Sequence, residues 1–164
     1  MLSTKKIVAV GIFAALGTVL GGISFPIGPA RVMPLQHTLN AIMGIILGPW
    51  LAAAAALITG MLRLSLGLGT IFALPGGVFG GIVVGLAYRL TGRQLAALTE
   101  PIGTALIGGA VSGMLVAPAI GSAETSLYFM GIFAVSAIPG AIIGYIVLKA
   151  FNFINLPLLE EFGY

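Results

Sequence analysis

The sequence predicts an all-α integral membrane protein, a bundle of six transmembrane helices that forms one domain over residues 1–164. Hydrophobic residues make up 59% of the chain and charged residues only 7%, whereas a soluble domain carries about 25% charged residues. The mean hydropathy is +1.18. Long runs also lack Asp, Glu, Lys and Arg, and each is long enough for a spanning helix of about 20 residues: 7–30, 32–62, 64–88, 101–123 and 125–148. The lipid bilayer is therefore the expected surroundings of most side chains.

Prolines and glycines divide these runs into helices. The run 32–62 would make a single helix of about 46 Å at 1.5 Å per residue, which is longer than the bilayer core. Gly48-Pro49 is expected to cut it, because proline suits the first position of a new helix. A proline-containing loop over 24–34 and a glycine-rich loop over 67–77 provide the other breaks. The predicted helices cover about 5–23, 35–47, 49–66, 78–90, 101–120 and 125–151.

The positions of the basic residues predict the orientation of the bundle. With six helices and a cytoplasmic N-terminus, only Arg31 and Arg63 fall on the outer side. The other five fall inside, as the excess of basic residues in cytoplasmic loops requires: Lys5, Lys6, Arg89, Arg93 and Lys149. We therefore expect a multi-pass protein of the cell membrane with both termini in the cytoplasm.

A polar cluster lies at the start of the second predicted helix. Gln36, His37 and Asn40 are three or four residues apart and share one helix face. Arg31 precedes them, and Arg63 lies on the neighbouring helix beyond the Gly-Pro turn. Ionisable residues within a membrane are functional candidates by default, so we expect these side chains to bind a small polar ligand on the outer side. Two other interpretations are hydrogen bonds between helices and, for Arg31, a lipid headgroup anchor.

Three further residues are expected to close this pocket. Thr70 and Phe72 belong to the glycine-rich loop, and Tyr128 begins the last predicted helix. The two aromatic rings could stack on a ring-shaped ligand, although a single aromatic residue is more often part of the packing.

Small residues recur along the first predicted helix. Gly11 and Ala15, Ala14 and Thr18, and Gly17 and Gly21 are each four apart, a spacing that lets helices approach closely. Such a strip serves either for packing within the bundle or for docking to another subunit, and Gly11 and Ala15 are the candidates for docking.

The chain lacks the motifs of several classes of function. The chain has no phosphate-binding loop with its lysine and no cysteine, and its basic residues are scattered, so we expect no ATPase, no metal or other cofactor and no nucleic-acid partner. The segment around Ser112 resembles the serine motif of rhomboid intramembrane proteases, but the only histidine, His37, precedes it. A serine without a base is a weak nucleophile, so we predict that the protein is not an enzyme.

These features together resemble the substrate-binding S components of energy-coupling factor (ECF) transporters. Within that class, the motifs are similar to those of the ThiW family over about residues 7–150. The matching segments are Gly28-Pro-Ala-Arg31, Pro34-Leu-Gln-His37, Asn40, Leu47-Gly-Pro-Trp50, Arg63, Gly69-Thr70 and Phe72-Ala-Leu-Pro-Gly-Gly77. S components carry an Ala-x-x-x-Ala pattern on the first helix, where this chain has Gly11 and Ala15.

The resemblance implies the partners and the ligand. It implies docking of the first helix onto an ECF transmembrane T subunit, which works with two ATPase subunits. It also implies import of a thiamine precursor, with the hydroxyethylthiazole moiety as the expected ligand. The competing class is a stand-alone secondary transporter or channel for a small polar solute. Such proteins usually use buried carboxylates, whereas Glu100 and Glu124 both fall at predicted helix ends.

Overall fold

The computed structural model describes residues 3–27 and 30–151, so Gly28 and Pro29 of the first family motif lie outside the described residues. Helix α1 (Thr4–Leu20) leads into a hairpin of β1 (Phe25–Ile27) and β2 (Ala30–Val32). The kinked helix α2 (Pro34–Ser65) and helix α3 (Ala73–Thr91) follow. A helical stretch then runs over Gln94–Ala119, and α6 (Ser126–Phe151) ends the described chain.

The stretch Gln94–Ala119 changes its winding several times. It consists of the 3-10 turn η1 (Gln94–Thr99), the π-helical segments η2 (Ile102–Gly108) and η3 (Ser112–Val116), and the short α segments α4 (Gly109–Val111) and α5 (Ala117–Ala119). The prediction of one helix over 101–120 is therefore correct in place, but the helical winding begins earlier, at Gln94.

Four helices within the described part of the chain are long and apolar enough to cross a membrane, namely α2, α3, Gln94–Ala119 and α6. The chain is accordingly an all-α membrane protein, with the β hairpin as a small addition. The count of six transmembrane crossings stays a prediction, since α1 has only 17 residues and α2 contains the kink.

Helix α2 folds back on itself at Gly48. The backbone of Gly48 has φ 75° and ψ 175°, and Pro49 begins the second arm. In a straight helix Gln36 and Arg63 would lie about 40 Å apart at 1.5 Å per residue, yet the Arg63 guanidinium donates a hydrogen bond to the Gln36 amide oxygen. The two arms are therefore antiparallel. Gly48 supplies the positive φ, which residues other than glycine rarely adopt.

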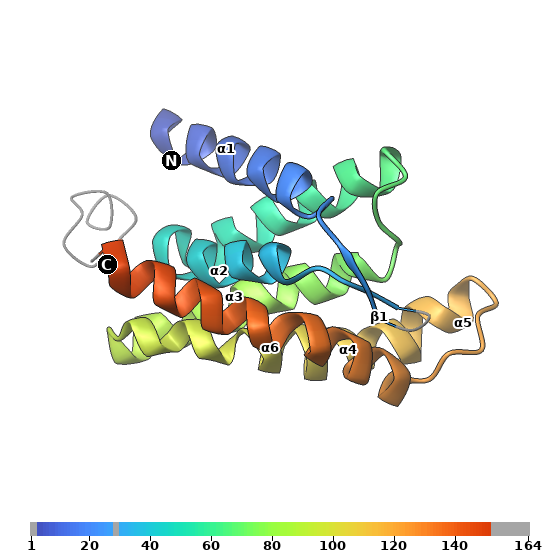
Figure 1. Cartoon of the computed structure of the whole chain (residues 1–164). Helices are drawn as coiled ribbons and strands as arrows, with labels where there is room; N and C mark the ends of the chain where they lie inside the picture. Colours follow the sequence, from blue (N-terminus) through green and yellow to red (C-terminus); the bar gives the residue numbers. More distant parts are fainter. Residues whose placement is uncertain (1–2, 28–29, 152–164) are drawn as a thin grey trace.

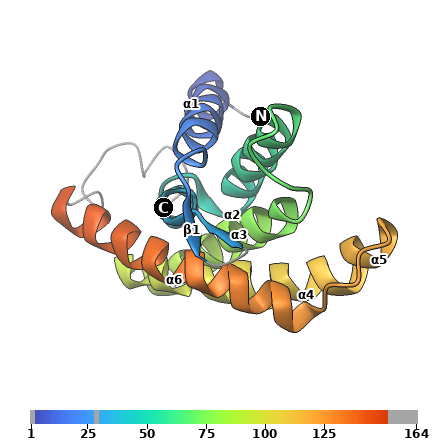
Figure 2. The same ribbon diagram turned by 45° about the vertical axis from the view of Figure 1, so that its right-hand side comes forward.

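Helix α2 forms the centre of the bundle. It lies between α1 on one side and α3 and α6 on the other (Figures 1 and 2). Its first arm is almost wholly buried, and the apolar core gathers around it, including Met43, Ile45 and Val84. Both ends of the described chain lie at the same end of the bundle (Figure 1).

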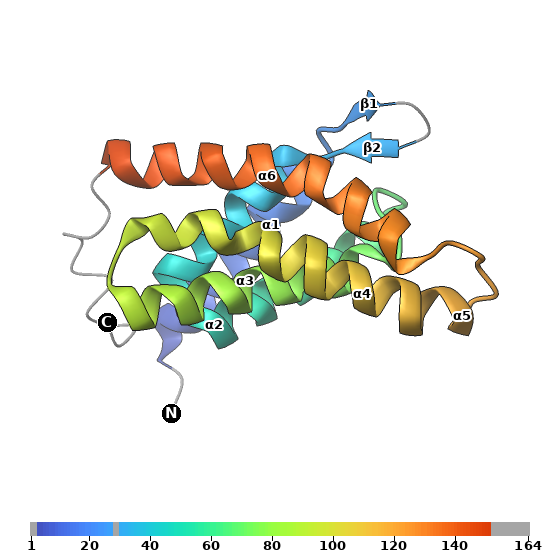
Figure 3. The same ribbon diagram turned by 90° about the horizontal axis from the view of Figure 1, so that it is seen from below.

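Two predicted loops contain regular structure. The loop over 24–34 holds the antiparallel hairpin, in which Phe25 pairs with Val32, and the hairpin lies beside α6 at the other end of the bundle (Figure 3). The prediction that the fourth helix begins at Val78 is wrong, because α3 begins at Ala73. Pro75 lies in its first turn, where a missing N–H costs no helical hydrogen bond.

Glycines of α3 allow the close helix contacts. A Cβ on Gly85 would lie 2.6 Å from Pro49 Cα, and one on Gly81 would lie 3.1 Å from Ala52 Cβ. Both glycines lie in the helix predicted over 78–90, and they let α3 pack closely against the second arm of α2.

The small residues of α1 divide between two faces. Ala14 and Gly17 are buried, and a Cβ on Gly17 would lie 2.7 Å from Thr59 Oγ1 on α2. Gly11 and Ala15 are exposed, and a Cβ on Gly11 would meet nothing within 4 Å. One strip packs inside the bundle, and the other lies uncovered on its outside.

Candidate functional site

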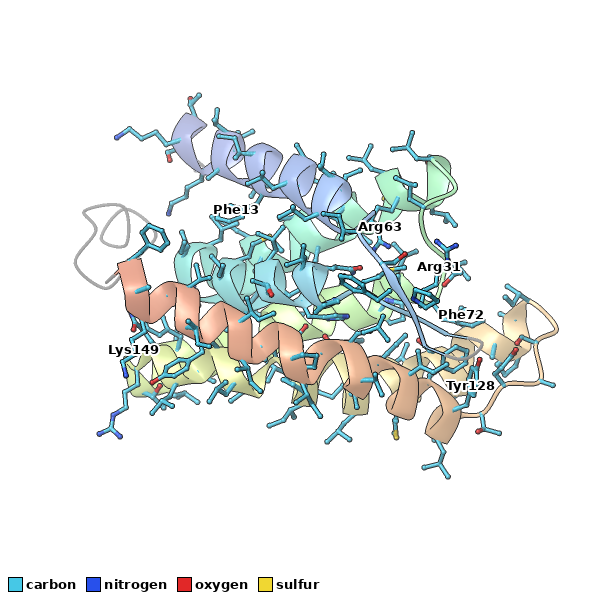
Figure 4. The ribbon with its side chains drawn as sticks, viewed as in Figure 1. Phe13, Arg31, Arg63, Phe72, Tyr128 and Lys149 are labelled. Atoms are coloured by element: carbon cyan, nitrogen blue, oxygen red, sulfur yellow. The ribbon has the colours of Figure 1, made fainter. Side chains whose placement is uncertain are left out.

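A cavity of about 600 Å³ opens at the end of the bundle opposite the chain ends. Its walls come from the hairpin, both arms of α2, the loop 66–72, the start of α3, Thr104 and α6. Figure 4 shows Arg31, Arg63, Phe72 and Tyr128 gathered toward this end, whereas Lys149 lies at the other. The volume is in the range of pockets for small molecules, about 300–1,000 Å³.

Seven of the eight predicted ligand-binding residues line this cavity: Arg31, Gln36, His37, Arg63, Thr70, Phe72 and Tyr128. Asn40 differs from the prediction. It is 2% exposed and lies behind the wall, where its amide donates a hydrogen bond of 3.2 Å to Glu100 Oε1. It therefore supports Glu100, which in turn contacts the wall residue His37.

Glu100 is the residue that the sequence reasoning misplaced. It was expected at a helix end, but it follows η1 inside the helical stretch Gln94–Ala119, and its side chain is fully buried. Its Oε1 lies 2.9 Å from His37 Nδ1 and accepts a hydrogen bond of 2.7 Å from Thr104 Oγ1, in addition to the one from Asn40. Glu100 is therefore a buried carboxylate, contrary to the prediction from the sequence. Glu124, by contrast, is exposed and lines the cavity.

The contact with Glu100 orients His37. Because Nδ1 faces the carboxylate, Nε2 is the ring nitrogen left to meet a ligand in the cavity that His37 lines. A carboxylate behind a histidine fixes the orientation of the imidazole ring and the position of its proton. The second oxygen of Glu100, Oε2, is buried and has no hydrogen-bond partner among the described residues.

Arg63 connects four parts of the wall. Its guanidinium donates to Gln36 Oε1 and, at 2.9 Å, to the backbone oxygen of Leu68. It also lies 2.8 Å from Met33 Sδ, and a Cβ on Gly21 at the end of α1 would lie 2.9 Å from its Nε. Arg63 thereby fixes the orientation of the Gln36 amide and holds the loop 66–72 in place.

An aromatic cluster forms the opposite wall. The ring centroids of Phe72 and Phe129 are 4.4 Å apart, and those of Tyr128 and Phe129 are 5.4 Å apart. Phe133 extends the cluster, with its centroid 6.0 Å from that of Phe129. The site thus pairs a polar wall on α2 with an aromatic wall on α6 and the loop 66–72, which suits a small ring with polar substituents.

The sequence predicts no metal site. Among residues 3–27 and 30–151, no cluster of three or more His, Cys, Asp or Glu side chains could hold a metal ion. Ser112 is buried, and its hydroxyl donates a hydrogen bond of 3.3 Å to the backbone oxygen of Phe72. It serves the packing of the helix 94–119 against the loop 66–72.

A comparison with known protein families shows to which family the chain belongs. The profile of ThiW, described as thiamine-precursor transporter protein, matches residues 7–153. The chain belongs to the ThiW family. ThiW is a family of transporters and not of enzymes.

Curated relatives of this ThiW chain come from Streptococcus pneumoniae. The UPF0397 protein of strain CGSP14 is 40% identical over 86 residues, which are 50% of this chain and 47% of the relative. The UPF0397 proteins of strain G54 (serotype 19F) and of serotype 4 match to the same extent. The chain therefore spans about half the length of the curated relatives it matches.

Sequence reasoning missed Glu100 and Thr104, although one signal was present. They are four residues apart, so both side chains lie on one helix face. A carboxylate followed by a hydroxyl at this spacing within apolar surroundings could have marked both residues as buried and paired.

Proposed function

We propose that this ThiW chain is the substrate-binding subunit of an ECF-type transporter, and that it takes up hydroxyethylthiazole, a thiamine precursor with a thiazole ring. The observation that carries the proposal is the cavity itself, in which the polar wall of Gln36 and His37 faces the aromatic wall around Phe72. The ring of the ligand would stack on the aromatic wall. Its ring nitrogen and hydroxyl would form hydrogen bonds with the polar wall.

The orientation in the cell membrane follows from the same proposal. Both ends of the described chain lie opposite the cavity (Figure 1). If the cavity opens to the outside, both termini are cytoplasmic, and the charge distribution of the sequence favours that orientation. The chain would bind its ligand from outside and perform no chemistry, and the ATPase subunits would supply the energy.

Calorimetry on the detergent-purified protein tests the ligand. We expect hydroxyethylthiazole to bind, and we expect His37→Ala and Gln36→Ala to weaken binding by roughly 5- to 150-fold, because each removes a buried hydrogen-bond partner. Gln94→Ala is the control, since Gln94 donates its hydrogen bond to the backbone oxygen of Leu148 near the other end. Wild-type affinity in both wall variants would place the site elsewhere.

The exposed strip of α1 is the proposed docking surface for the T subunit. Gly11→Leu and Ala15→Leu should abolish uptake of labelled hydroxyethylthiazole by cells, because the leucine side chains would separate helices that small residues let meet. Ligand binding by the purified variants should remain at the wild-type level, since both positions face away from the bundle.

The same substitution on the inner strip is the matched control. Gly17→Leu would collide with Thr59, so it should lower folding and binding together. If Gly11→Leu and Ala15→Leu leave uptake unchanged, the docking proposal is wrong.

The buried pair of His37 and Glu100 favours a second candidate, a proton-coupled secondary transporter. Buried carboxylates and histidines form proton relays in such proteins, and this pair lies at the wall of the cavity. Uptake that persists in cells without the ATPase subunits and collapses with the proton gradient would favour this candidate. Uptake that requires the ATPases would exclude it.

A further inference from the structure

The deepest charge in the cavity wall belongs to Arg63. Its side chain is 1% exposed, and its acceptors are neutral: the Gln36 amide, the Leu68 backbone oxygen and the Met33 sulfur. Among the residues that the structure describes, the ion-pair distance to a carboxylate is met by His37 and not by Arg63. A buried charge without a counterion creates a strong potential, because the low-dielectric surroundings screen it little.

The other charged groups leave this positive potential in place. Glu100 is fully buried behind the wall, where its Oε1 contacts His37, Asn40 and Thr104, and it does not line the cavity. Arg31 and Glu124 are both exposed at the cavity, and their opposite charges offset each other in contact with water. Among the described residues, Arg63 is therefore the buried charged side chain that lines the cavity.

The same arginine determines which atom of Gln36 meets the ligand. Since Oε1 accepts the hydrogen bond from Arg63, the amide N–H groups of Gln36 are the atoms left for the cavity that it lines. The polar wall therefore presents an N–H donor next to a positive charge. A ligand atom that fits there carries a lone pair and no positive charge.

We propose that the cavity accepts a thiazole whose ring nitrogen has a free lone pair, and that it rejects the same ring when that nitrogen is quaternised to a thiazolium. This inference rests on the proposed function, because it assumes a thiazole-type ligand. A quaternary nitrogen cannot accept the hydrogen bond from Gln36, and its positive charge is repelled by Arg63. The site would thus separate the free thiazole precursor from molecules that contain a thiazolium ring.

The aromatic wall could favour a thiazolium, in opposition to the charge of Arg63. Aromatic faces attract cations, so a cage of open rings would favour a thiazolium. Here Phe72 and Phe129 pack on each other at 4.4 Å, and Phe129 is 5% exposed, so these rings use much of their faces for one another. The charge of Arg63 then decides the preference.

Calorimetry with two matched compounds tests the proposal, namely 5-(2-hydroxyethyl)-4-methylthiazole and its N-methylthiazolium salt. The wild-type protein should bind the neutral thiazole at least about tenfold more tightly than the salt, because the salt brings a like charge into the cavity. Gln36→Glu would place a carboxylate beside Arg63, and Arg63→Gln would remove the charge. Each should narrow the affinity ratio by about threefold or more.

Lys149→Gln removes one positive charge at the other end of the molecule (Figure 4) and should leave the ratio unchanged. Gln36→Glu keeps the test decisive if Arg63→Gln fails to fold. The inference would be overturned if the wild type bound the thiazolium as tightly as the thiazole. It would also be overturned if the variants kept the wild-type affinity ratio, because the added methyl group would then weaken binding by its size and not by the charge of the ring. If the wild type binds neither compound, the proposed function itself fails.

Discussion

Replacing Glu100 by alanine is expected to lower the free energy of unfolding by about 3–5 kcal/mol, the usual effect of removing one partner from a buried pair. Three groups would lose their shared acceptor, namely His37 Nδ1, Asn40 Nδ2 and Thr104 Oγ1. Binding of hydroxyethylthiazole should also weaken, because His37 would no longer be held in one orientation. Denaturant unfolding in detergent and calorimetry measure the two effects.

Glu100→Gln is the matched control for this prediction. The amide keeps the shape of the side chain and one oxygen that can accept from Thr104 and Asn40, so we expect a smaller loss of stability. Glu124→Ala removes the exposed carboxylate of the cavity and should leave unfolding unchanged. An alanine variant at position 100 that unfolds like the wild type would mean that the buried cluster contributes nothing to stability.

Replacing Gly103 by valine should have an effect of similar size by a steric route. Even a Cβ at this position would overlap the backbone oxygen of Phe79 and would lie 2.8 Å from Gly80 Cα. These are backbone atoms of α3, so no side chain can turn aside. Overpacking in a core costs about 1–3 kcal/mol and occasionally more, and we expect at least the upper value.

The control for this steric prediction is Gly131→Val on α6. A Cβ on Gly131 would meet nothing within 4 Å, so this variant should unfold like the wild type. Thermal unfolding of both variants in the same detergent provides the comparison. Equal midpoints for the two variants would contradict the close approach of α3 to the helix 94–119.

Features set by local sequence could be predicted. The break at Gly48-Pro49 follows from the conformational limits of the two residues. It also follows from the length of the uncharged run 32–62, which as one helix would be longer than the bilayer core. The shared face of Gln36 and His37 follows from helical spacing alone. Both sets of residues lie where local rules placed them, at the kink of α2 and on the cavity wall.

Features that depend on tertiary packing could not be predicted. The sequence predicted Glu100 at a helix end. It is buried instead, because the 3-10 turn over Gln94–Thr99 continues the helical stretch before it and His37 and Asn40 of α2 pack against it. The start of α3 at Ala73 was hidden because glycine indicates a loop locally, whereas here it allows contact between helices. Asn40 was predicted to face the ligand because a helix face does not reveal how deep each residue lies.

The reversal of α2 at Gly48 has a consequence for the sidedness of the whole protein. A hydropathy window reads Pro34–Ser65 as one apolar span, and a single span would carry the chain from one face of the membrane to the other. Because the two arms are antiparallel, the chain instead returns to the face from which α2 started. In a membrane, each loop after Ser65 would therefore lie on the opposite side from the one that a count of continuous apolar segments assigns. The kink at Gly48-Pro49 would thus decide whether α2 crosses the membrane once or twice.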